Sequence, residues 1–367
     1  MILMKKNYLK SSAVTLSSIL IPMLISACGG ERQNDAVAVS EGSLTLALGE
    51  ITTQTIVPAV DDFYAQTQTL TSRAESLCSD INSANLLALQ NQWRTTHSSW
   101  GSLSPFRFGP LTDNLITPAY LFIDSYRLRG DEYTATVREA LTTAITGSST
   151  LNTDYFTALA FNRTGLLAIE VAAFSTLDGS SQTPADVIAE LSSTPRKCDA
   201  IVGLSGALQQ RAQHVYDGWH TEYLESGISF TEMLTSNALE DGTDAMTAII
   251  TSAQEYLDYM SNRDTVSNVA QLADNSWAYA QAGIDTINLL LAGNDNTSVS
   301  LYSLMRASGN SLNADAVEVN IAAAEEAIAD QDATSFNAIA ALLDGNFKRE
   351  IPDSLDVSLG INFSDGD

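Results

Sequence analysis

Apolar residues recur every three or four positions along most of the chain, and strict alternation of apolar and polar residues is rare. From about Ile51 onward this spacing predicts amphipathic helices, because residues three and four apart lie on one face of a helix. One apolar stripe comprises Val317, Ile321, Ala324 and Ile328. A longer stripe comprises Val269, Ala273, Trp277, Ala280, Ile284, Ile287 and Leu291. Traces of alternation are confined to residues 43–48 and the C-terminal tail, so we expect an all-α body.

Two helix starts are marked by a threonine followed by a proline, at Thr183-Pro184 and Thr194-Pro195. The threonine hydroxyl can cap the first turn, and proline suits that turn because its missing N–H would have no partner there. Residues 175–195 are rich in Ser, Thr, Gly and Pro and form the most natural break. Because a chain with about 320 ordered residues usually forms two cores, we expect one bundle over 51–180 and a second over 195–367.

Two segments on either side of this break are similar to each other. Ala88–Trp100 and Ala207–Trp219 share their beginning, a histidine and the final tryptophan. The similarity indicates a helical segment that is repeated on both sides of the break. Chance similarity between two helices is the alternative.

The first 27 residues are typical of an export signal. Three lysines precede a mostly apolar stretch over 11–24, and small residues then lead to Cys28, as in a bacterial lipobox. An ordinary cleaved signal with a chance cysteine is the alternative. A transmembrane helix is disfavoured because the stretch is short and interrupted by Pro22.

We therefore predict a lipid on Cys28 that attaches the protein to a membrane, followed by a tether over residues 28–50. Gly29 after the cysteine, rather than Asp, indicates the outer membrane, with the protein facing the periplasm.

The chain is strongly acidic, with 18 Lys and Arg residues against 44 Asp and Glu residues and a formal net charge of −26. Removal of residues 1–27 takes away three lysines and no acid, which changes the charge to −29. Such a surface repels nucleic acids and anionic headgroups, so nucleic-acid binding is excluded. Acidity also hints at metal handling, but exported proteins adapted to cold or salt are acidic for other reasons.

Once Cys28 is lipidated, Cys78 and Cys198 are the remaining cysteines. An exported compartment permits disulfides, and each cysteine lies at an end of a predicted helix, so we predict a bridge that fastens two bundle halves. Two separately buried thiols are the alternative. With three histidines in the chain, no Cys/His zinc cluster can form.

Three segments resemble the imelysin family. Residues 165–170 resemble its Gly-x-His-x-x-Glu motif, although Leu167 occupies the histidine position. Residues 100–110 resemble a family tryptophan followed by Phe-Arg-Phe-Gly-Pro, with Ser104 where relatives often carry Glu. Residues 359–367 are similar to the family's Gly-Phe…Asp-Gly-Asp terminus. The resemblance spans nearly the whole mature chain and implies two related up-down helical bundles packed side by side, in which the motif helix closes the first bundle and faces the second.

The resemblance implies a ligand or metal pocket around Gly165, Leu167 and Glu170. Positions 167 and 170 share a helix face, and a His-x-x-Glu pair would direct an imidazole and a carboxylate to one point, as in metal sites of helical bundles. Leucine offers no lone pair. Glu170 lies between apolar runs, so its carboxylate needs a partner if buried. It is either a ligand or acid in an interdomain pocket or a member of an ion pair with Arg163 or Arg107.

Three further residues complete the candidate pocket. Arg107 lies between two phenylalanines, and we expect its guanidinium to reach a carboxylate. His97 shares a helix face with two tryptophans, which favours a packed, hydrogen-bonded histidine over a metal ligand. Asp365 could attract a cation to the rim of the pocket, or it could fray in water like most termini.

We therefore predict an imelysin-like cell-envelope lipoprotein that binds a ligand or a metal, iron or zinc, without catalysis. The resemblance implies a role related to iron uptake. One alternative is a metallopeptidase with an atypical ligand set, in which a residue such as His97 supplies a missing ligand. A metal hydrolase usually has three protein ligands and a general base, whereas this motif offers one ligand. Another alternative is an interaction module that docks a second envelope protein.

Overall fold

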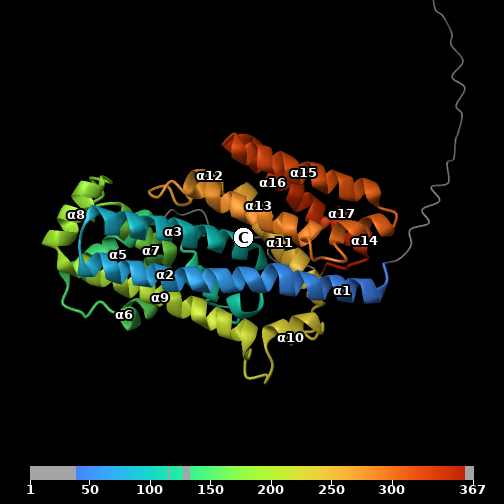
Figure 1. Ribbon diagram of the computed structural model, residues 1–367, viewed down its shortest axis with the longest axis horizontal. Coiled ribbons are helices and arrows are strands. Elements are labelled where there is room, and N and C mark those ends of the chain that lie inside the picture. The colour runs from blue at the N-terminus through green and yellow to red at the C-terminus, as the bar shows by residue number, and fades with distance from the viewer. Residues whose placement is uncertain (1–38, 115, 127–132, 360–367) are drawn as a thin grey trace, which may run out of the picture. The chain divides into compact units, whose positions relative to one another are not determined.

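The computed structural model describes residues 39–114, 116–126 and 133–359, and every regular element within them is a helix (Figure 1). The prediction of an all-α fold is confirmed. Cys28, Asp365 and the export signal lie outside the described residues. No described helix is long and apolar enough to cross a membrane.

The helices up to residue 220 are α1 (Glu41–Ile51), α2 (Val57–Ser79), α3 (Ser83–Leu103), α4 (Ala119–Ile123), α5 (Thr134–Thr146), α6 (Thr153–Thr157), α7 (Gly165–Phe174), α8 (Pro184–Ser193) and α9 (Pro195–His220). Those that follow are α10 (Phe230–Thr235), α11 (Ala245–Asn262), α12 (Thr265–Asn268), α13 (Ser276–Ala292), α14 (Leu301–Ala307), α15 (Ser311–Ala329), α16 (Ala333–Lys348) and α17 (Glu350–Leu355). A π-helical segment η1 (Thr52–Ile56) and the 3₁₀ turns η2 (Ser104–Phe106), η3 (Gly109–Leu111) and η4 (Phe161–Arg163) complete the elements.

The helices form two groups that meet along α3 and α13. In the first group α2 packs along α3 and α9, while α7 packs against α3, α5 and α9 (Figure 1). In the second group α11 packs along α16, and α15 packs against α13 and α16. The described residues of both groups belong to one compact unit.

The division between the groups differs from the expected one. The expected break at 175–195 assigns α9 to the second bundle, whereas α9 packs along α2 in the first group. The similar segments 88–100 and 207–219 consequently lie in α3 and α9, two helices that both contact α2. The buried face of α9 packs against α2 and α7. This packing determines which helix group α9 joins more than the composition of the loop does.

Residues 41–51 are helical, so the expected tether does not extend to residue 50. Ser40 caps α1 by accepting a hydrogen bond from the Ser43 amide at 3.1 Å. Leu48 and Ile51 are buried and Leu46 is exposed, which is a helical distribution and not a strand-like alternation. The helix continues through η1 into α2.

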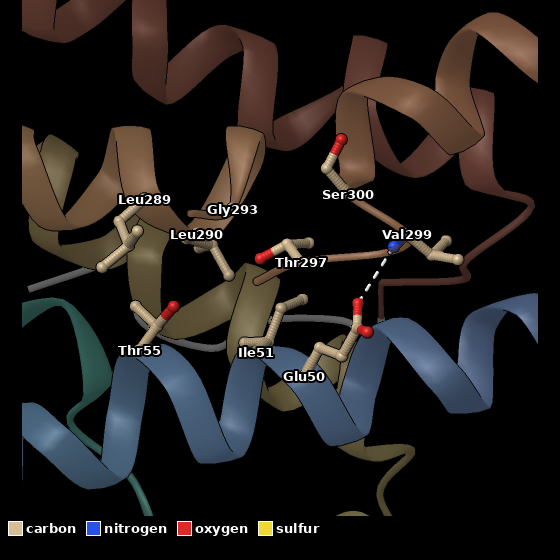
Figure 2. A pocket seen from close by; sticks show the side chains of 9 residues that line it. All are labelled: Glu50, Ile51, Thr55, Leu289, Leu290, Gly293, Thr297, Val299 and Ser300. Carbon is tan, nitrogen blue, oxygen red and sulfur yellow. Dashed lines mark hydrogen bonds between the residues drawn. The ribbon is translucent and has the colours of Figure 1, made fainter. Parts of the chain in front are cut away.

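Glu50 connects α1 to the loop between α13 and α14. Its carboxylate accepts hydrogen bonds from the amides of Ser298 at 3.1 Å and Val299 at 3.0 Å, as Figure 2 shows for Val299. Beside it lies a cavity of about 10 Å³, lined in part by Ile51, Thr55 and by residues of the loop. The cavity has room for about one water molecule, so it is too small for an organic ligand.

The sequence pattern predicts α15 better than α13. All four residues of the shorter stripe are buried in α15. The longer stripe is interrupted, because α13 begins only at Ser276. Val269 and Ala273 precede it in a segment where Ala270 (φ 54°) and Asp274 (φ 53°) have left-handed backbones. This break leaves backbone amides free to bond outside the helix.

The two Thr-Pro pairs start α8 and α9 as predicted. Thr183 accepts a hydrogen bond through Oγ1 from the Asp186 amide at 3.3 Å. Thr194 makes no side-chain cap, but its carbonyl accepts from the Lys197 amide at 2.9 Å.

Cys78 and Cys198 form a disulfide, with their Cα atoms 5.4 Å apart. The bridge joins the end of α2 to the start of α9, both of which belong to the first helix group. It therefore fastens two neighbouring helices of one bundle rather than two bundle halves.

Candidate functional site

Glu170 is the one polar residue of α7, whose other nine residues are glycine or apolar. All ten residues of α7 are buried, and Glu170 is 1% exposed. One carboxylate oxygen, Oε1, accepts a hydrogen bond from the Ala273 amide at 2.8 Å. The other, Oε2, accepts a hydrogen bond from the Tyr126 hydroxyl. Within the described residues neither Arg163 nor Arg107 pairs with Glu170, so its partners are uncharged groups.

Burial raises the pKa of the Glu170 carboxyl to about 7. The hydroxyl of Tyr126 and the backbone amides of Ala273 and Leu272 act in the opposite direction, because they stabilise the charged form. The carboxyl therefore changes its charge near neutral pH.

The segment before α13, whose Ala273 amide binds Glu170, is also hydrogen-bonded to the first helix group. Arg94 on α3 donates through Nε to the Ala273 carbonyl at 2.8 Å. Asn275 donates through Nδ2 to the Arg94 carbonyl at 3.2 Å. Since the Ala273 amide also binds Glu170, one short segment before α13 is bonded to both α3 and α7. The site therefore lies where the two helix groups meet.

His97 is stacked between aromatic rings in the same region. Its ring centroid lies 4.9 Å from both the Trp93 and the Tyr279 rings, and the Tyr126 ring approaches edge-on at 5.7 Å. The Nδ1 atom lies 3.1 Å from Nδ2 of Asn275. Because Nδ2 is a donor, Nδ1 accepts and the neutral ring carries its proton on Nε2, which has no partner within the described residues.

Burial lowers the pKa of His97 to about 3, so the ring is neutral in the folded protein over the ordinary pH range. This is the packed, hydrogen-bonded state that the helical spacing favours.

Arg107 reaches a carboxylate, and that carboxylate is Asp124. The Nη2 atom lies 3.3 Å from Oδ2 of Asp124, and both side chains are buried. The guanidinium carbon also lies 5.2 Å from the Tyr259 ring, 5.4 Å from the Tyr120 ring and 5.9 Å from the Trp100 ring. Aromatic faces and one carboxylate together compensate for burial of the cation.

Gly165 is required by a close approach of the chain to α4. Its φ is 78°, and a Cβ atom there would lie 2.6 Å from the carbonyl oxygen of Phe122 and 2.8 Å from that of Ile123. Ser125 also donates through Oγ to the Thr164 carbonyl at 2.8 Å. The glycine of the motif therefore has a structural role, and Leu167, 2% exposed, is a core residue without polar atoms.

Substitution of Gly165 by alanine is expected to lower the free energy of unfolding by about 3 kcal/mol, because it combines a strained φ with a clash against backbone. Urea titration of the purified protein measures this change. Gly49→Ala is the control, because nothing lies within 4 Å of its Cβ position. That variant should gain a few tenths to about 1 kcal/mol from helix propensity. Equal changes in the free energy of unfolding for Gly165→Ala and Gly49→Ala would contradict the structural role of Gly165.

The described residues do not fit a tightly bound iron or zinc ion. They contain no group of three or more His, Cys, Asp or Glu side chains that could hold a metal. At Glu170 both oxygens already accept hydrogen bonds from the protein, and position 167 offers no ligand. A metal ion there would have a single protein ligand, the Glu170 carboxylate, and would have to displace the protein donors that already bind it.

The structure brings Glu170, His97 and Arg107 into one region and surrounds them with residues that the sequence did not single out. These are Tyr126, Ala273, Asn275 and Tyr279. The one available signal was the apolar stripe through Ala273, and it suggested an uninterrupted helix.

The architecture and this interhelical site define a class of all-α proteins built from two packed helix groups. The family model described as Imelysin matches residues 56–354, and the chain belongs to the imelysin family. The resemblance noted in the sequence is thereby confirmed. No curated protein matches the sequence.

Two solved structures share the fold. An imelysin-like protein from Psychrobacter arcticum has a TM-score of 0.68 and 17% identity, and the match covers 88% of this chain and 99% of that one. A protein described as an iron-regulated protein A precursor from Parabacteroides distasonis has a TM-score of 0.66 and 15% identity, with 88% and 97% covered. At these identities the likeness concerns the fold alone.

Proposed function

We propose that this protein is an exported, lipid-anchored member of the imelysin family that binds a ligand without cleaving it, in a role related to iron uptake. The observation that carries the proposal is the state of Glu170. Its two oxygens accept hydrogen bonds from Tyr126 and Ala273. Leu167 stands where the resemblance to the family implies the histidine of a metal-binding pair. A catalytic zinc needs three protein ligands and an open position. The link to iron rests on the name of the Parabacteroides distasonis relative.

Substitution of Leu167 by histidine is expected to create binding of ferrous iron or zinc. The new imidazole would lie one helical turn from Glu170, and two ligands together hold a metal more strongly than one. We expect weak wild-type binding and a gain of about tenfold or more in the variant, measured by calorimetric titration.

Ile169→His is the matched control for this titration. It also places an imidazole in α7 at a fully buried aliphatic position, but residues one apart do not face each other on a helix. No gain in Leu167→His would mean that the pocket has lost other ligands as well. Tight wild-type binding that survives Glu170→Ala would place the metal elsewhere.

Incubation with insulin or casein separates a binding protein from a peptidase. The proposal requires that neither substrate is cleaved in the presence of zinc or iron. Cleavage that a chelator abolishes would favour the metallopeptidase, with His97 as the first ligand to test because its ring lies against Tyr126, which binds Glu170.

Substitution of Cys28 by serine is expected to release the protein from membranes or to block its maturation, because the thiol is the proposed site of lipid attachment. Fractionation of cells that express wild type or variant measures the effect. The double variant Cys78→Ser/Cys198→Ser is the control, because it removes the disulfide without leaving an odd thiol and keeps Cys28, so it should stay in the membrane fraction. Unchanged membrane retention and processing in Cys28→Ser would remove the anchor from the proposal.

A further inference from the structure

The interior where α3, α11 and α13 meet contains several hydrogen-bond donors that have no partner within the described residues. They are Nε1 of Trp100, Nε and Nη1 of Arg107, and the hydroxyl of Tyr256. Trp100 is fully buried, Tyr256 is 1% exposed and Arg107 is 7% exposed. Buried donors are normally paired, because an unpaired donor has given up its bond to water without replacement.

These donors lie in the neighbourhood of Tyr279 on α13. The Tyr256 ring lies 6.5 Å from the Tyr279 ring. The Tyr279 hydroxyl lies 3.2 Å from Oγ of Ser104, which itself donates to the Trp100 carbonyl at 2.7 Å. Arg107 follows three residues after Ser104, and its guanidinium carbon lies 5.9 Å from the Trp100 ring. The unpaired groups are therefore neighbours.

The charge and the hydrogen-bond donors of Arg107 determine which kind of ligand this region can bind. Its guanidinium stays protonated at every accessible pH, so Nε and Nη1 remain donors. Its ion pair to Asp124, the one formed with the described part of the chain, uses Nη2. A water molecule would bring two hydrogens of its own into a region whose unpaired atoms are donors. A carboxylate brings only acceptors.

We propose that this group of donors, Trp100, Arg107 and Tyr256, binds the carboxylate group of a small organic ligand. The inference rests on the proposed ligand-binding function and specifies the chemical class of the ligand. Nε2 of His97, whose ring stacks on Tyr279 with the centroids 4.9 Å apart, provides a further donor without a partner in the described residues, for a second oxygen of the same ligand.

Trifluoroacetate is a suitable probe, because its fluorine resonance broadens or gains a bound signal when the carboxylate binds. We expect binding to the folded wild-type protein, competed by acetate and not by the neutral acetamide. Trp100→Phe and Tyr256→Phe each remove one unpaired donor and break no hydrogen bond described within the protein. Each should weaken binding about tenfold or more, as expected for a hydrogen bond to a charged group.

The chain offers a matched control for both variants. Trp219 and Tyr302 are also buried and also carry a polar hydrogen that no described residue accepts, but they lie in α9 and α14. Trp219→Phe and Tyr302→Phe should therefore bind the probe like the wild type. Equal losses in site and control variants would indicate a general effect on packing and would overturn the proposal.

Two other outcomes would also overturn it. If the wild type binds no trifluoroacetate after prolonged incubation, water satisfies the donors. If phosphate competes and acetate does not, the ligand class is wrong. Neither outcome affects the metal titration of Leu167→His or the insulin digest, so failure here is distinguishable from failure of the proposed function.

Discussion

The free energy of unfolding of the wild type is expected to fall by about 3 kcal/mol between pH 4.5 and 8, and replacement of Glu170 by glutamine is expected to abolish this fall. The pKa of Glu170 is raised from 4.5 to about 7 in the folded protein, mainly by burial. Below pH 4.5 the carboxyl is neutral in both folded and unfolded states. As the pH rises towards 7, the unfolded state loses its proton first, so the folded state becomes relatively less stable. Above about pH 7 both states are ionised and the loss is complete.

Glutamine keeps the shape of the neutral acid and does not titrate. Its amide oxygen can accept from the Ala273 amide, while its NH₂ group can donate to the Tyr126 hydroxyl oxygen. Urea unfolding of wild type and variant at several pH values measures the difference. His97, whose pKa burial lowers to about 3, is present in both proteins and stays neutral in the folded state over this range.

Glu50→Gln is the control for this experiment. Hydrogen bonds from Ser298 and Val299 lower the pKa of Glu50, so its contribution to stability is present above pH 4.5 and is lost only at lower pH. The difference between wild type and Glu50→Gln should therefore stay constant between pH 5 and 8. A constant difference for Glu170→Gln as well would show that Glu170 ionises normally, which is incompatible with its burial.

Removal of the Cys78–Cys198 disulfide is expected to lower the free energy of unfolding by about 4 to 5 kcal/mol. The bridge closes a loop with a sequence separation of 120 residues, and it restricts the unfolded chain far more than the folded one. The double variant Cys78→Ser/Cys198→Ser avoids an odd thiol, and urea unfolding measures its stability.

Thiol alkylation of the denatured, unreduced wild-type protein is the companion measurement. Neither cysteine should react until a reductant is added, and reduced wild type should then match the double variant in stability. Two thiols that label without reduction would contradict the bridge.

The sequence predicted the helices better than their partners. Periodicity identified the buried face of α15, and two Thr-Pro pairs marked the starts of α8 and α9. These features are local, because helix faces and caps depend on residues within one or two turns. The prediction for α13 began too early, since apolar spacing cannot reveal the left-handed residues that interrupt a helix.

Grouping of the helices depended on contacts between distant segments. The composition of residues 175–195 indicated a domain boundary, yet α9 packs along α2. A flexible loop permits a boundary but does not require one. The shape of the buried faces decides which helices pack together, and that shape cannot be read from periodicity alone.

By itself, the sequence determined that Glu170 would need a partner, because a carboxylate inside an apolar helix cannot remain unpaired. It also places Leu167 at the position where the resemblance to the family implies a histidine. Only the tertiary structure decided which partners Glu170 has. The sequence suggested arginines, but the structure supplies the Tyr126 hydroxyl, 44 residues away, and the Ala273 amide, 103 residues away. A carboxylate can accept from any donor, so only the packing of distant segments determines which donors reach it.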